Sequence, residues 1–264
     1  MVVTYALARL LLGLGLAATL PAPNAPIPTT PRPVAAALVG TERSLNDAIN
    51  RWDKTGPVPR DVTLLALYEQ RTIRVLGERP ALARAVIKLD PAAKDDVAAR
   101  VDLGRLVAAG PAPRTSPKVG PAKPPLQLLA WYREAQRRFH VRWQLLAAVN
   151  FVESAFGKVR NASTAGAQGP MQFEPATWRA YGLGGNVHDP HDAILGAANY
   201  LAANRAAGNE REALFHYNPS LLYVDAVKRY ANRIARDPHA LFRYYSWQAY
   251  FRTRTGYRRV TGPR

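Results

Sequence analysis

The chain has 264 residues, of which 48% are hydrophobic and 21% are charged. This length and composition leave room for one or two packed domains and exclude a chain that is disordered throughout. Cysteine is absent, which excludes a disulfide framework, a thiol nucleophile and a zinc site held by thiolates. The formal net charge of +17 predicts attraction to polyanions such as nucleic acid, anionic lipid or the acidic polymers of a bacterial envelope, without choosing among them.

Residues 1–25 have the pattern of a secretory signal. Arg9 precedes an apolar run from Leu10 to Leu20, and proline and small residues follow that run. The run is too short to span a bilayer. An extension back to Val2 approaches spanning length but puts Arg9 inside the membrane. The sequence therefore predicts an exported protein, in which this segment is either a cleaved signal peptide or an N-terminal membrane anchor.

Two proline-rich segments divide the rest of the chain. Residues 26–33 and 111–125 are predicted to be extended linkers, and the second carries three basic residues without an acid. Between them, residues 34–110 have the apolar periodicity of helices and contain no catalytic motif, repeat or strand-like alternation. We predict a small helical module of unknown role, which we expect to be dispensable for chemistry because a linker separates it from every motif below.

Residues 126–236 are predicted to form an all-α domain. Helix signals follow one another in this segment: Pro175 marks the first turn of one helix, Asp189 the start of the next, Asn209 the cap of a third, and Ser220 precedes the last. No strand-like alternation interrupts them.

The centre of this domain is an apolar helix that contains one carboxylate, Glu153, and is followed by a glycine-rich loop. Nearly every face of the helix is apolar, so we expect Glu153 to be desolvated, and desolvation raises the pKa of a carboxyl group. Such a group stays protonated near neutral pH and can act as an acid. The alternative is a buried glutamate held by an arginine or by backbone donors, and the helix alone supports both interpretations equally.

A series of motifs resembles the catalytic domain of the soluble lytic transglycosylase (SLT) family, over about residues 128–234. In chain order the motifs are Glu153-Ser154, GAQGPMQF with PATW between Gly166 and Trp178, Asp189-Pro190, and Tyr217-Asn218. The loop and the segment after Tyr217 are most similar to the actinobacterial branch. The resemblance implies a lysozyme-like fold, and it covers no motif in residues 1–110.

The family resemblance implies an exported peptidoglycan lytic transglycosylase. Such an enzyme cleaves the MurNAc-β-1,4-GlcNAc bond and leaves a 1,6-anhydro-MurNAc end. Glu153 would act first as the acid and then as the base, whereas ordinary glycosidases use a pair of carboxylates. Two alternatives stay open: a hydrolytic lysozyme-like muramidase and a non-catalytic peptidoglycan-binding protein.

Other site residues carry over by position. By resemblance, Tyr217 hydrogen bonds the catalytic glutamate, and Ser163, Gln172 and Asn218 belong to the sugar-binding groove. Ser154 is instead expected to make a structural contact at the helix end, because no histidine pairs with it.

Two further places hold acidic residues with more than one interpretation. Glu174 could be a second acid, but its position before Pro175 favours a helix N-terminal residue. Residues 188–192 combine histidine and aspartate at short spacing, as some metal sites do, but Asp189 and Asp192 are needed to start a helix. We therefore expect no metal and no other cofactor.

Residues 237–264 form a basic tail that is rich in aromatic residues. Such a tail either stacks on bases or sugars, or packs its aromatic rings onto the helices while its arginines stay in solvent, and we favour the second interpretation. The predicted partner is the peptidoglycan glycan strand, with anionic wall polymers as candidates for the basic surface and no nucleic acid. The predicted location is extracytoplasmic, either secreted or anchored at the cell wall.

Overall fold

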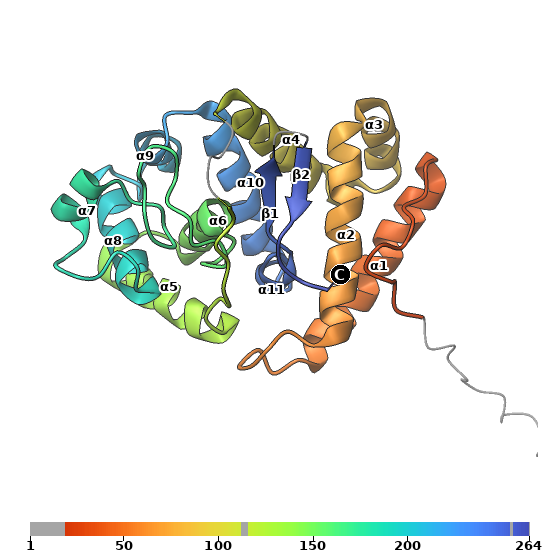
Figure 1. Ribbon diagram of the computed structural model, residues 1–264, viewed down its shortest axis with the longest axis horizontal. Coiled ribbons are helices and arrows are strands. Elements are labelled where there is room, and N and C mark those ends of the chain that lie inside the picture. The colour runs from red at the N-terminus through yellow and green to blue at the C-terminus, as the bar shows by residue number, and fades with distance from the viewer. Residues whose placement is uncertain (1–18, 112–115, 254–255, 264) are drawn as a thin grey trace, which may run out of the picture.

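The computed structural model describes residues 19–111, 116–253 and 256–263, which are mostly helical (Figure 1). The helices are α1 (Pro31–Arg51), α2 (Arg60–Glu78), α3 (Pro80–Leu89), the 3₁₀ turn η1 (Pro91–Ala93), α4 (Lys94–Ala109), α5 (Pro125–Phe139), α6 (Trp143–Ser154), α7 (Pro175–Tyr181), α8 (Pro190–Ala203), α9 (Glu210–Tyr217), α10 (Leu221–Arg236) and α11 (Ala240–Ser246). The prediction of a helical protein is confirmed. A short antiparallel hairpin near the C-terminus, β1 (Tyr250–Thr253) and β2 (Gly256–Arg259), was not predicted.

Most of the predicted signal peptide or anchor falls on residues 1–18, outside the described residues. In the part of the chain that the structure describes, no helix combines the length and the hydrophobicity needed to cross a membrane.

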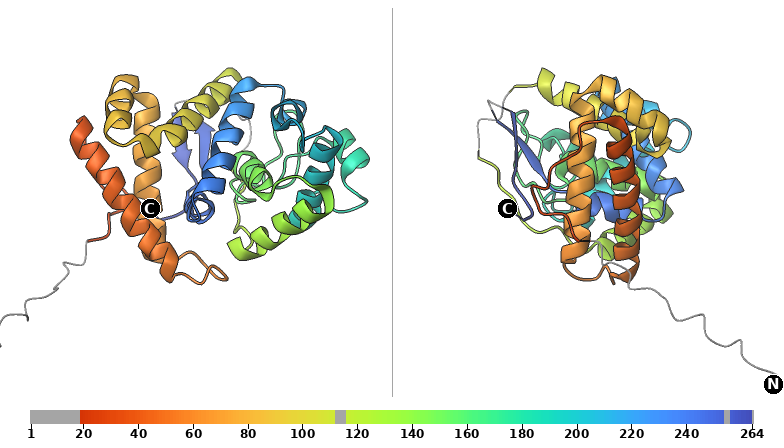
Figure 2. Two further views of the ribbon diagram at one scale, coloured as in Figure 1. Left: turned by 180° about the vertical axis from the view of Figure 1, so that it is seen from behind. Right: turned by 90° about the vertical axis from the view of Figure 1, so that its right-hand side faces the viewer.

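Helix α10 is the central element of the molecule. It packs against α4 on one side and against α6 on the other. Helices α5 and α7 to α9 gather beyond α6, and α1 to α3 lie beyond α4, as the front and rear views show (Figures 1 and 2). The two halves of the chain therefore meet along α10.

One continuous hydrophobic core runs through both halves. Ile49 and Val62 lie in the predicted helical module, Leu146 and Val227 lie in the predicted domain, and the exposed fraction of each side chain is 0%. Residues 116–124, in the second segment predicted as a linker, contain no helix, and part of this stretch pairs with the chain after α6: the Gly120 amide donates to the Lys158 carbonyl at 3.0 Å. Helices on either side of this segment thus bury their apolar faces together.

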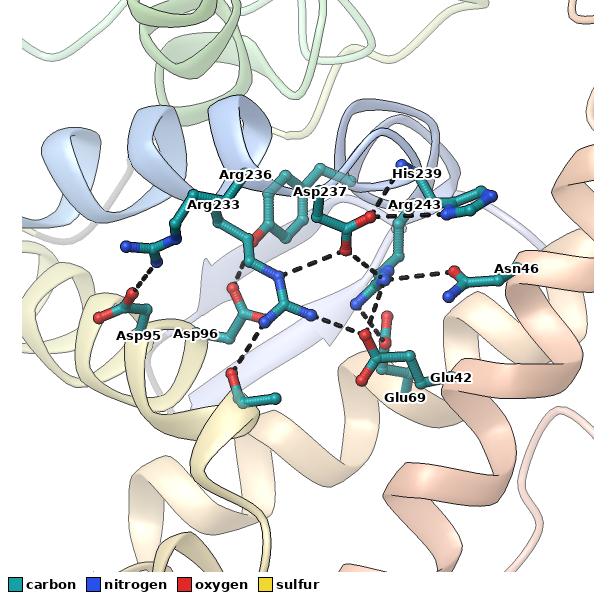
Figure 3. A network of polar contacts seen from close by, with 12 residues as sticks. Glu42, Asn46, Glu69, Asp95, Asp96, Arg233, Arg236, Asp237, His239 and Arg243 are labelled. Atoms are coloured by element: carbon teal, nitrogen blue, oxygen red, sulfur yellow. Dashed lines mark hydrogen bonds and ion pairs between the residues drawn. The ribbon is translucent and has the colours of Figure 1, made fainter.

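Charged side chains also join the two halves (Figure 3). Arg243 of α11 is only 1% exposed, and it contacts Glu42 at 2.9 Å, Glu69 at 3.4 Å and Asp237 at 2.8 Å. Arg233 of α10 also contacts Glu42, at 2.7 Å. Since a buried charge without its counterion is strongly destabilising, this network requires α1, α2, α10 and α11 to stay together.

The C-terminal tail packs as we favoured, with one correction. Tyr244, Tyr245 and Trp247 are buried against the helices. Arg243, however, is buried with them rather than solvated, because carboxylates from α1 and α2 surround it. The part of the tail from Ala240 to Trp247 is therefore largely part of the core.

Candidate active site

Helix α6 carries Glu153 from the core to the wall of a cavity. Leu146 and Val149 on this helix are 0% exposed, and Asn150 is 1% exposed. Burial raises the pKa of the Glu153 carboxyl to about 7, although a hydrogen bond from Tyr223 works in the opposite direction. The predicted desolvation of this group is found, and it favours the protonated form of the carboxyl at a higher pH than for an exposed glutamate.

The tyrosine that contacts Glu153 is Tyr223, on α10. Its hydroxyl donates to Glu153 Oε1 at 2.6 Å. The Tyr217 hydroxyl instead donates to the carbonyl of Met171 at 2.7 Å. The prediction that Tyr217 hydrogen bonds Glu153 is therefore wrong: the two rings stack at 6.5 Å between centroids, and α10 brings the second of them to the carboxyl.

The backbone leaves α6 directly after Glu153 in an unusual conformation. Ala155, Phe156 and Gly157 all have positive φ, at 51°, 63° and 83°. Ser154 holds this exit, since its hydroxyl donates to the Pro170 carbonyl at 2.6 Å and accepts from the Gly157 amide at 2.8 Å. The predicted structural role of Ser154 is confirmed.

The glycine-rich loop returns the chain to the same cavity. Gly169 has a φ of 76°, and a Cβ added there would lie 1.9 Å from the Val187 carbonyl oxygen. Glycine is therefore required by both conformation and space. On either side of it, Gln168 and Phe173 exchange backbone hydrogen bonds, each of 2.8 Å, and this tight turn places Gln172 on the wall of the cavity that Glu153 also lines.

A cavity of about 460 Å³ brings the predicted site residues together. Its walls contain all five of them: Glu153, Ser163, Gln172, Tyr217 and Asn218. Glu174, Tyr200 and His216 line it as well. Glu153 thus lies in a cavity that is also lined by hydroxyl, amide and imidazole groups and by the carboxyl group of Glu174.

Comparison with protein families agrees with this geometry. Residues 131–239 match the family model of the transglycosylase SLT domain. This segment is an SLT domain. No curated protein and no solved structure gave a match.

The SLT domain contains every predicted site residue, and Tyr223 as well. The resemblance to the SLT lytic transglycosylases is confirmed, and the helical structure agrees with their lysozyme-like fold. Enzymes of this family act on cell-wall peptidoglycan, and the SLT domain therefore implies peptidoglycan as the substrate class and suggests action outside the cytoplasm.

A second carboxylate lies in the cavity of the SLT domain. Glu174 precedes α7 at its N-cap position, as predicted, but its side chain makes no capping hydrogen bond. Burial and Tyr223 account for the pKa of Glu153, whereas the charge of Glu174 acts on Tyr200, whose pKa is raised mainly by burial. Glu174 is therefore not among the groups that set the pKa of Glu153.

Sequence reasoning gave Tyr223 no role in the site. The sequence does place Tyr223 on the apolar face of the last helix of the SLT domain, which predicts a buried side chain, and its exposed fraction is 1%. A buried tyrosine hydroxyl needs a hydrogen-bond partner, and a buried acid is a suitable one.

The remaining helix starts agree with their predicted structural roles. The Asp189 carboxylate accepts hydrogen bonds from the amides of His191 and Asp192, at 2.8 Å and 3.1 Å. Across residues 19–111, 116–253 and 256–263, no group of three or more histidine and acidic side chains has an arrangement suited to a metal ion.

Proposed function

We propose that this chain is an exported peptidoglycan lytic transglycosylase that cleaves the MurNAc-β-1,4-GlcNAc bond and forms 1,6-anhydro-MurNAc ends. The observation that carries the proposal is Glu153, a desolvated acid with a pKa of about 7 that lines a cavity with Gln172 and Asn218. A group with this pKa is protonated often enough to give a proton at neutral pH, and basic enough to take one back.

The proton path needs one carboxyl group. Glu153 gives its proton to the glycosidic oxygen as the bond to C1 breaks. The carboxylate that remains is stabilised by the hydrogen bond from Tyr223. It then removes the proton of the sugar's own C6 hydroxyl while that oxygen attacks C1. Glu153 ends protonated, the products are an anhydro sugar and a free hydroxyl, and no water is consumed.

The neighbouring polar groups suit sugar binding. The Ser163 hydroxyl oxygen accepts from the Ala167 amide at 3.0 Å, so its own proton is available to a ligand. The Gln172 amide nitrogen donates to the carbonyls of Asn161 and Gly169, at 3.2 Å and 2.9 Å, which leaves its oxygen to accept from a sugar hydroxyl. In this proposal both residues orient the glycan strand in the groove.

Hydrolysis by a lysozyme-like muramidase is a second candidate because Glu174 lines the same cavity. A paired carboxylate could activate water on the other side of the sugar. Among the described residues the hydrogen-bond partner of the Glu153 carboxyl is Tyr223 and not Glu174, which agrees with the single-acid mechanism.

Replacement of the acid tests the proposal. We expect Glu153→Gln to fold, to bind glycan strands, and to release almost no soluble muropeptides from purified peptidoglycan. The matched control is Glu134→Gln, which alters a surface acid of α5. Substantial release of anhydro-muropeptides by the Glu153 variant would contradict the assignment, and loss of glycan binding by it would leave the site without its proposed ligand.

A further inference from the structure

Glu153 also lines a second cavity, of about 290 Å³, that the SLT domain does not build alone. Arg74 of α2, Arg100 of α4, Tyr250 of β1 and Tyr257 of β2 form part of its walls. All four lie outside residues 131–239, the part that matches the family. The helices before the SLT domain and the hairpin after it therefore help to line a cavity that Glu153 also lines.

The two arginines of this cavity are held by aromatic rings. The guanidinium of Arg74 lies 3.9 Å from the centroid of Tyr250 and 5.0 Å from that of Tyr257. The guanidinium of Arg100 lies 5.3 Å from the Tyr257 ring. Cation–π contacts of this kind attract both guanidinium groups to the aromatic rings.

The charge of Glu78 acts on Arg74, but no carboxylate forms an ion pair with either arginine among the residues that the structure describes. Arg243, in contrast, has three ion pairs. The Nε atom of Arg100 is buried and has no hydrogen-bond partner. Burial, and then the positive charge of Arg100, lower the pKa of Arg74 to about 10. A bound anion would relieve both the repulsion and the unsatisfied donor.

The positive character continues beyond this cavity. Arg100 and Tyr257 also line a third cavity, of about 700 Å³, where Arg84 and Arg105 join them. One acidic residue, Glu78, lines it too. Glu153 therefore lines both the first and the second cavity, and Arg100 lines both the second and the third.

We propose that Arg74 and Arg100 form a carboxylate-binding subsite, which engages a carboxylate carried by muramic acid on the strand that Glu153 cleaves. This inference rests on the proposed function. Arginine suits the ligand because its planar fork matches a carboxylate. Because Glu153 is part of the same wall, the anion belongs to the glycan strand itself rather than to a separate phosphate polymer.

Two sources of that carboxylate exist on a strand. Muramic acid that has lost its peptide exposes the lactyl carboxylate, whereas muramic acid with a peptide stem carries carboxylates on the stem. The subsite has the same chemistry for both, and the choice decides whether the enzyme prefers stripped or peptide-bearing strands.

Binding measurements in the Glu153→Gln background separate these sources, because no turnover intervenes. Calorimetry would use three probes of equal glycan length: a peptide-bearing oligomer, the same oligomer stripped by an amidase, and a chito-oligosaccharide without carboxylates. Arg74→Gln and Arg100→Gln are expected to weaken binding of a carboxylate-bearing probe by roughly tenfold and to leave the chito-oligosaccharide unchanged. Loss confined to the peptide-bearing probe assigns the stem, and loss confined to the stripped probe assigns the lactyl group.

Two control variants keep the test specific. Arg60→Gln makes the same change at an exposed position of α2 that lines none of these cavities, and it should alter no affinity. Arg74→Lys keeps the charge and should recover part of the lost affinity. Thermal unfolding of each variant reports whether it is folded.

Several results would overturn the subsite. An equal loss for all three probes would mean a structural role for the arginines, and no loss for any would mean that they bind no carboxylate. Weaker binding of poly(glycerol phosphate) alone would assign the site to a phosphate polymer instead. If the Glu153→Gln parent binds no glycan probe, the proposed function fails together with the subsite, whereas arginine variants that bind like the parent overturn the subsite alone.

Discussion

The side chain of the acid, Glu153, accepts a hydrogen bond of 2.6 Å from the Tyr223 hydroxyl. The substitution Tyr223→Phe removes this donor, and a hydrogen bond to a charged group is worth about 1.5–3 kcal/mol. If this free energy is lost entirely from the transition state, turnover slows roughly ten- to a hundredfold. The donor stabilises the carboxylate, so its removal raises the pKa of Glu153 further above its usual range. The basic limb of the pH profile should therefore move to higher pH, which a pH–rate series on soluble glycan strands measures.

Tyr217→Phe is the matched control for that series. Its hydroxyl contacts the Met171 carbonyl and not the acid, so the variant should lose some stability and keep the pH profile of the unaltered enzyme. A shifted profile for the Tyr217 variant and an unshifted one for Tyr223→Phe would reverse the roles assigned to the two tyrosines.

The second carboxylate gives a separate prediction at the residue scale. Since Glu174 is not among the groups that set the pKa of Glu153, Glu174→Gln should reduce turnover by less than about tenfold and leave the products unchanged. The measurement is release of muropeptides from purified peptidoglycan. A loss as large as that of Glu153→Gln would indicate that two carboxyl groups take part in the reaction.

The sequence predicts the acid but not its partner. Desolvation of Glu153 follows from the apolar residues on its own helix, which is local information. Tyr217 and Tyr223 are close together in the chain, and only the packing of α10 against α6 decides which hydroxyl reaches the carboxyl. Local patterns do not contain that crossing geometry.

Among the elements, the glycine-rich loop has the least freedom to change. In Gly169→Ala, a methyl group would collide with the Val187 carbonyl at a positive φ, so we expect the loop to shift and the free energy of unfolding to fall by roughly 1–3 kcal/mol. Turnover should fall as well, because Gln172 follows in the same turn. Denaturant unfolding and muropeptide release measure the two effects.

Gly166→Ala is the control for this loop. Its φ of 87° also disfavours alanine, but no atom lies within 4 Å of the added methyl group. The cost should be smaller, about 1 kcal/mol. Equal losses for the two variants would show that conformation alone, and not the contact with Val187, requires the glycine.

The sequence predicts the N-terminal ends of several helices well. Pro175 begins α7, Asp189 caps α8 and Asn209 caps α9, because proline and short polar side chains mark helix starts through local bonds. The hairpin of β1 and β2 was missed because arginines and aromatic residues give it no clear alternation, and its position depends on Arg252, which donates to the Gly110 carbonyl at 2.7 Å.

At the scale of the whole molecule, the packing of the helices before Pro111 changes the expectation for truncation. The linker suggested that these helices are dispensable, but α4 packs on α10, and Glu42 and Glu69 neutralise the buried Arg243. A chain that begins at Pro121 should therefore expose apolar surface, leave that charge unpaired, and lose cooperative unfolding. A soluble truncated chain with a sharp unfolding transition and full turnover would contradict this prediction.

The sequence could not indicate this packing. Its proline-rich segment at 111–125 has the composition of a domain boundary, and composition is a local property. The contacts that cross it, such as Glu42 with Arg243, join positions about two hundred residues apart, and no motif marks them. The resemblance to the SLT family begins near residue 128, so it also does not predict how the preceding helices pack.

In the proposed reaction one carboxyl group cleaves the strand without water. Digestion of purified peptidoglycan in water enriched in heavy oxygen, followed by mass spectrometry of the muropeptides, tests it most directly. The account predicts muramic ends that are one water lighter than reducing ends and carry no heavy oxygen, and it predicts their loss in Glu153→Gln. Reducing muramic ends that contain heavy oxygen would contradict it and would identify the protein as a hydrolase.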